Sequence, residues 1–222
     1  MKISKITKTF SLALLALAFC TPMTMAAGDE SPNASTAFSV TLPEYLKITV
    51  NAPTFAKTVS YDNNYAGANI EAMNPQFTVI TNDPAKDIYL QAKCTATDGA
   101  PNALFSLAGE GGVYSADKLY IALANEGRAT TAAVGKAMSA TASDTPDVIR
   151  LSLTPTLNND NFGASAITAE WDVAKSQVHY VLKNGTNTLS YATGVKIEAN
   201  SFSTHDTHGI YKATLTMTNT SL

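Results

Sequence analysis

Two histidines and an aspartate stand close together in one short polar stretch near the end of the sequence. These residues are His205, Asp206 and His208. Imidazole and carboxylate groups are both zinc ligands, so the stretch is a candidate metal site. A further ligand from elsewhere in the chain would be needed, and the sequence does not indicate one. The sequence therefore favours a polar loop before the last strand, and we predict no metal or other cofactor.

Two carboxylates flank the only tryptophan, and paired carboxylates beside an aromatic ring are a feature of glycosidase sites. Glu170 and Asp172 stand on either side of Trp171. A secreted enzyme would require one of these carboxylates to meet a histidine. The alternation instead favours a solvated strand face with Trp171 in the core. Because the motifs of serine hydrolases, zinc peptidases and phosphate loops are also missing, we predict that the chain is not an enzyme.

Asparagine-rich stretches offer oxygen atoms of the kind that calcium prefers. The stretches 62–64 and 158–161 lack the ligand spacing and terminal glutamate of an EF-hand loop, so the sequence gives calcium little support. Cys94 falls in line with apolar residues at every second position, which predicts a buried core residue rather than a reactive thiol.

The first 27 residues have the pattern of a secretory signal peptide. Lys2, Lys5 and Lys8 precede an apolar run over 10–20, and small residues follow at 24–27. A lipid anchor at Cys20 is disfavoured by the bulky Phe19 before it. Loss of three lysines changes the net charge from −3 to −6, which argues against a nucleic-acid partner. We expect export through the inner membrane of a bacterium, a secreted or surface location, and no later membrane span.

Residues 36–222 are predicted to form a single all-β domain after a mobile leader at 28–35. Apolar and polar residues alternate in many short segments, with turn residues between them and no strand–helix–strand rhythm. This pattern indicates an antiparallel β-sandwich with immunoglobulin-like Greek-key connections, and a jelly roll is the alternative. Hairpins are predicted for 77–81 with 88–94 and for 178–182 with 188–192, the second because Asn-Gly suits a tight turn.

Two alternating segments near the ends of the domain carry most of the functional argument. The first precedes Pro43 and places Thr36, Phe38, Val40 and Leu42 on one face. Because proline cannot donate to a strand ladder, it separates this segment from a second strand at 46–50. The closing strand runs over 209–219 and should turn one face toward the core, formed by Tyr211, Ala213, Leu215 and Met217.

The chain resembles fimbrial subunits of the chaperone–usher type, and it is locally similar to the colonisation-factor (alpha-class) major pilins. The resemblance lies in 35–50, in the T-N-D-P-A-K-D-I-Y-L stretch over 81–90, and in the Gly209-Ile210-Tyr211 entry to the closing strand. It covers about a quarter of the mature chain. The aromatic residue that many pilins carry next to the end is replaced here by Ser221-Leu222.

The resemblance implies a structural surface protein of a fimbrium, with a role in cell adhesion, that assembles by strand addition. Residues 36–42 would be the donor strand that enters the next subunit, which gives head-to-tail self-association, and a periplasmic chaperone would be a further partner. Two alternatives stay open. The segment is the first strand of a self-contained sandwich, or the protein is a monomeric module that binds carbohydrate or protein through loops, with Tyr61, Tyr65 and Tyr114 as candidate contacts.

Overall fold

The computed structural model describes residues 35–51, 54–56, 58, 75–94, 102–139, 145–191, 195–198, 201 and 203–222. The predicted signal peptide over 1–27 and the predicted leader up to residue 34 lie outside these ranges. The chain divides between Thr41 and Leu42 into two units, and the second of them holds all the strands described below. The boundary therefore falls at the end of the predicted donor segment.

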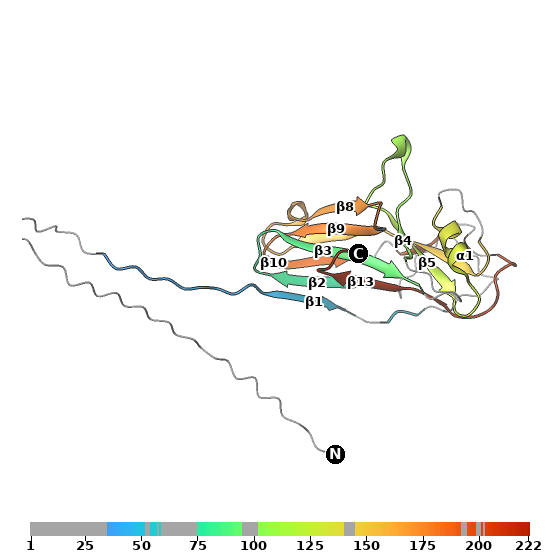
Figure 1. The fold of residues 1–222 in the computed structure, drawn as a ribbon, viewed down its shortest axis with the longest axis horizontal. Helices are drawn as coiled ribbons and strands as arrows, with labels where there is room; N and C mark the ends of the chain where they lie inside the picture. The colour runs from blue at the N-terminus through green and yellow to red at the C-terminus, as the bar shows by residue number, and fades with distance from the viewer. Residues whose placement is uncertain are drawn as a thin grey trace, which may run out of the picture. The chain divides into compact units, whose positions relative to one another are not determined.

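The unit from Leu42 to Leu222 is an antiparallel all-β sandwich (Figure 1), which confirms the predicted fold class. The first sheet has the strand order β1 (Leu46–Val50), β2 (Gln76–Thr81), β10 (Gly185–Ser190), β7 (Thr156–Asn159). The second has the order β13 (Thr214–Thr218), β3 (Lys86–Lys93), β9 (Gln177–Leu182), β8 (Thr168–Asp172). The immunoglobulin-like connectivity stays a prediction.

The two sheets share one core of alternating side chains. Val79 of β2, Leu90 of β3 and Tyr180 of β9 are fully buried in the same apolar cluster. The hydroxyl oxygens of Tyr180, within β9 of the second sheet, and of Tyr191, which follows β10 of the first sheet, lie 3.2 Å apart. Cys94 and Trp171 are buried in this core, as predicted, and burial raises the pKa of the Cys94 thiol.

A third sheet extends the domain and was not predicted. It has the order β11 (Lys196–Ile197), β6 (Val148–Leu153), β5 (Leu119–Asn125), β12 (Tyr211–Lys212), with β4 (Leu104–Phe105) paired to β5. Helix α1 (Thr131–Ala137) contacts β5 and β6, and the hydroxyl of Thr130 caps it by accepting from the backbone of Ala133.

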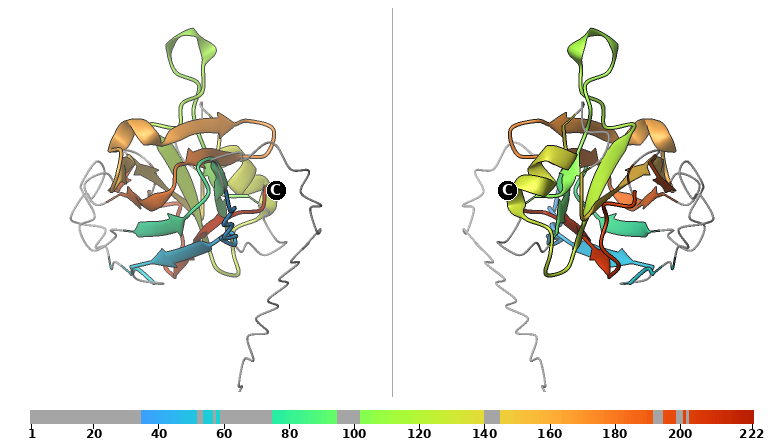
Figure 2. Two further views of the ribbon diagram at one scale, coloured as in Figure 1. Left: turned by 90° about the vertical axis from the view of Figure 1, so that its left-hand side faces the viewer. Right: turned by 90° about the vertical axis from the view of Figure 1, so that its right-hand side faces the viewer.

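Short 3₁₀ turns occupy two of the connections. They are η2 (Glu110–Gly112) and η3 (Ala164–Ala166). The loop that carries η2 projects beyond the sheets in both views of Figure 2. Its base is tied by Ser106, whose hydroxyl donates to the carbonyl of Ser115 and accepts from the amide of Ser115.

Both predicted hairpins are wrong, because their strands belong to different sheets. β2 lies in the first sheet and β3 in the second, and the same is true of β10 and β9. Gly185 lies at the connection between β9 and β10 and has a positive φ of 109°. Here the positive φ lets the chain pass from one sheet to the other, instead of forming a two-residue hairpin turn. A residue with a side chain would be strained at this φ, and its Cβ would also lie 2.5 Å from the side-chain ends of Asp160 and Asn161, so the connection favours a glycine.

The buried tyrosine pair predicts unfolding in alkali. Burial raises the pKa of Tyr180 to about 12 and that of Tyr191 well above its usual value of 10.0. A group with a raised pKa contributes stability below its unfolded pKa and loses it as the pH rises through the folded pKa. For Tyr180 alone the loss between pH 10 and 12 is about 3 kcal/mol.

We therefore expect the thermal unfolding midpoint to fall over this pH interval, with tyrosinate absorbance rising together with the loss of circular dichroism. If all the tyrosines titrate near pH 10 while the fold persists, this assignment is wrong.

Candidate site for strand addition

The predicted donor face is exposed. The side chains of Phe38 and Val40 are each 92% exposed and that of Leu42 is 78% exposed, and Thr36 is exposed as well. Residues 35–45 have no strand partner among the described residues. The segment 36–42 carries no charged side chain. Three large apolar side chains at every second position, without a core of their own, have the composition of a strand that becomes buried only on binding.

The register of the first sheet explains why this segment has no partner in β2. β1 is antiparallel to β2, and the ladder ends where Leu46 faces Thr81. β10 reaches the same row, because Gly185 also faces Thr81. After Thr81 the chain turns away into β3 at Lys86. Residues 42–45, which precede Leu46 in the same unit, therefore extend past the end of β2.

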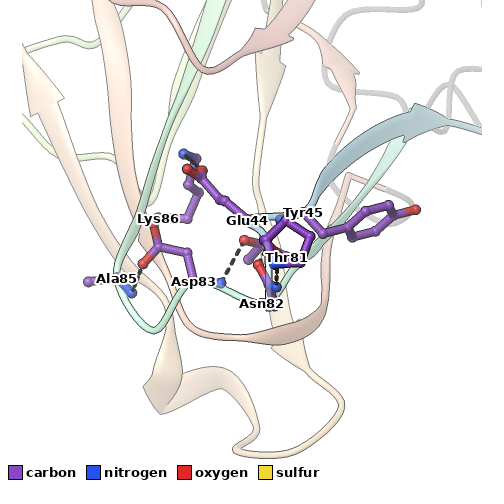
Figure 3. A network of polar contacts seen from close by, with 8 residues as sticks. Glu44, Tyr45, Thr81, Asn82, Asp83, Ala85 and Lys86 are labelled. Carbon is purple, nitrogen blue, oxygen red and sulfur yellow. Dashed lines mark hydrogen bonds and ion pairs between the residues drawn. The ribbon is translucent and has the colours of Figure 1, made fainter. Parts of the chain in front are cut away.

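One asparagine holds the chain at this exit point (Figure 3). The side-chain carbonyl of Asn82 accepts from the backbone amide of Tyr45 at 2.8 Å, and its side-chain amide donates to the carbonyl of Pro43 at 2.8 Å. The backbone amide of Asn82 also donates to the carbonyl of Tyr45 at 3.3 Å. The Asn82 side chain thus pairs with the backbone of the residues just before β1, where β2 no longer offers a partner. We call these contacts the Asn82 clamp.

The turn that carries the clamp is itself braced. The hydroxyl of Thr81 accepts from the amide of Asp83 at 3.1 Å, and the carboxylate of Asp83 accepts from the amide of Ala85 at 3.0 Å. Glu44 forms an ion pair with Lys86, and this hydrogen bond raises the pKa of the Lys86 ammonium group. Figure 3 shows the pair beside the clamp.

Two strand edges complete the site. Among the described strands, β1 and β13 each stand at one end of their sheet, with β7 and β8 at the other ends, and Figure 1 shows β1 and β13 on the side of the sandwich opposite β8. Leu46 and Ile48 of β1 and Leu215 of β13 are half-buried and pack against the core. An edge strand presents backbone amides and carbonyls for pairing, so these two edges are able to accept a further strand.

The predicted closing strand is present but divided between two sheets. Tyr211 lies in β12 of the third sheet, and residues after Ala213 form β13 of the second. Of the predicted core face, Met217 is buried, Ala213 and Leu215 are half-buried against the core, and Tyr211 is half-buried in the third sheet. The intervening Lys212, Thr214 and Thr216 are exposed.

In the candidate metal stretch, the aspartate stabilises the loop through hydrogen bonds to backbone amides. The carboxylate of Asp206 accepts from the amides of Asp147 at 2.7 Å and Ser203 at 2.6 Å, while His205 and His208 are exposed. Within the described part of the chain no group of three or more His, Cys, Asp or Glu residues is placed to hold a metal ion. In the stretch 158–161, Asn159 likewise accepts from two backbone amides, those of Asn161 and Phe162.

Glu170, Asp172 and His179 line one polar pocket of about 360 Å³ at the β8–β9 pair of the second sheet. Glu170 faces His179 across the β8–β9 pair. The Nε2 atom of His179 lies 2.8 Å from a carboxylate oxygen of Asp87, and its ring stacks on Tyr89. The pocket therefore combines carboxylates with an aromatic surface.

Comparisons of the chain with protein-family models, with curated proteins and with solved structures found no match. Among the described helices none is long and apolar enough to cross a membrane. The candidate site for strand addition is defined by its geometry alone. It consists of an exposed apolar segment, the Asn82 clamp next to it in the chain, and two strand edges. Sequence reasoning found the segment and the closing strand but missed the clamp. Asparagine is common in turns, so the type of residue at Asn82 did not indicate hydrogen bonds to Pro43 and Tyr45.

Proposed function

We propose that the chain is a structural subunit of a bacterial surface fibre. In this proposal residues 36–42 of one copy add as a strand beside β1 and β13 of the next copy. The observation that carries the proposal is the exposed, uncharged, alternating face of Phe38, Val40 and Leu42, attached to a domain with two outermost strands on one side.

The dimensions of the segment suit this role. Residues 36–42 span about 23 Å when extended, and the five residues of β13 span about 17 Å. The added strand therefore covers the whole edge. Its main chain supplies the pairing, and the alternating face supplies apolar contacts over Leu46, Ile48 and Leu215.

Head-to-tail addition has consequences for assembly and transport. Each copy uses one surface as donor and a different surface as acceptor, so the contact does not close on itself and yields a fibre. Before assembly the exposed edges and the apolar face favour aggregation. We therefore infer that a periplasmic chaperone covers them after export, and that the finished fibre stands at the cell surface, in line with the resemblance to chaperone–usher pilins.

The test compares the chain from residue 28 with a version that begins at Pro43. By light scattering and unboiled gels, the longer chain should form ladders that disappear on boiling, while the shorter chain stays monomeric. The proposal fails if the longer chain is a cooperative monomer that the truncation unfolds. Residues 36–42 would then belong to their own core.

A monomeric binding module is the second candidate function, favoured by the pocket that Glu170, Asp172 and Tyr89 line. Of the aromatic contacts predicted for such a module, Tyr61 and Tyr65 lie outside the described residues and Tyr114 is 41% exposed on the projecting loop. Carboxylates beside an aromatic surface suit a hydroxyl-rich ligand. The monomeric outcome of the truncation test would direct ligand titrations to this pocket.

A further inference from the structure

We propose that the Asn82 clamp prevents residues 36–42 from adding to the β1 edge of their own domain. The segment then remains available for addition to a second copy. This inference rests on the proposed function, because it concerns the same donor segment and the same edge. We call the competing state, in which the segment adds to its own β1, the self-closed form.

The self-closed form is a real competitor on physical grounds. The segment ends at Leu42 and β1 begins at Leu46, so three residues separate donor and edge. Three-residue loops join antiparallel strands in many hairpins. A tethered segment also experiences an effective concentration in the millimolar range. Without an opposing interaction, addition within one copy would therefore outcompete addition between copies.

The clamp opposes the turn that self-closure needs. The amide and carbonyl of Tyr45 and the carbonyl of Pro43 all pair with Asn82, on the β2 side of the chain. They hold residues 43–45 as a continuation of β1 past the end of the sheet. A hairpin loop at these residues would break all three hydrogen bonds and separate Glu44 from Lys86.

The chemistry of the side chain explains why an asparagine serves here. Its carboxamide offers one acceptor and one donor, and the clamp uses both. Aspartate would keep an acceptor for Tyr45 but lose the donor to Pro43. Alanine would lose both. The variants Asn82→Asp and Asn82→Ala therefore form a graded series.

The experiment measures how strongly each chain binds a labelled peptide of residues 35–42. Every variant is made as the chain from residue 28 and as the form that begins at Pro43, and each is assayed where light scattering shows a monomer. The readout is the dissociation constant of the chain from residue 28 divided by that of the form that begins at Pro43. This ratio removes any effect of Asn82 on the acceptor itself.

For the wild type we expect a ratio near one, because the clamped segment leaves its own edge free. Loss of two hydrogen bonds should raise the ratio about tenfold for Asn82→Ala, with Asn82→Asp in between. Equal ratios for all three chains overturn the inference but leave the proposed function standing. If the wild-type form that begins at Pro43 does not bind the peptide, the proposed function fails and this inference falls with it.

Discussion

Replacement of Val40 by aspartate is expected to weaken head-to-tail assembly by at least about a hundredfold, because the added strand would bury a carboxylate without a partner. The unfolding temperature of the isolated domain should not change, since the Val40 side chain is 92% exposed before assembly. The measurement is the concentration at which ladders appear on unboiled gels, with light scattering as a second readout.

Ser39→Asp is the matched control for this variant. Ser39 is exposed and stands on the opposite face of the alternating segment, so its substitution adds the same charge to the same stretch. We expect it to assemble nearly as the wild type does. Equal loss of assembly in both variants would show that charge in the segment matters rather than the apolar face, and the assignment of that face would be wrong.

The period of two in the sequence was sufficient to predict the faces of the strands but not their partners. Met217 and Cys94 were assigned to buried faces by alternation alone, and both are buried. The partner of β2 was missed because Asn82-Asp83-Pro84 suits a crossing between sheets as well as it suits a hairpin. Local turn chemistry does not determine whether the next strand stays in the same sheet.

For the candidate site, too, the sequence predicted the local segment but not the parts that depend on the arrangement of strands. The proposed donor face is a local pattern, so alternation alone placed Phe38 and Val40 on one side of the segment. The acceptor edges depend on which strands lie outermost, and this is a property of the whole sheet order. The clamp depends on Asn82 standing opposite Tyr45, which follows from the register of Leu46 with Thr81.

Leu215→Glu is expected to remove the acceptor while keeping the donor. Leu215 is half-buried on the outermost strand β13, so the substitution should lower the free energy of unfolding by about 1 to 2 kcal/mol and leave the domain folded. An added strand would bury the new carboxylate against its apolar face, so assembly should be lost. Thr216→Glu, on the exposed face of the same strand, is the control and should still form ladders.

Mixing the Val40→Asp and Leu215→Glu chains tests the direction of the contact. The first retains an acceptor and the second retains a donor, so each mixed pair offers one productive contact. After that contact forms, the remaining donor and the remaining acceptor are both defective. We therefore expect a one-to-one complex by light scattering and no longer species. Long ladders from the mixture, or two chains that stay monomeric together, would contradict head-to-tail addition through these two surfaces.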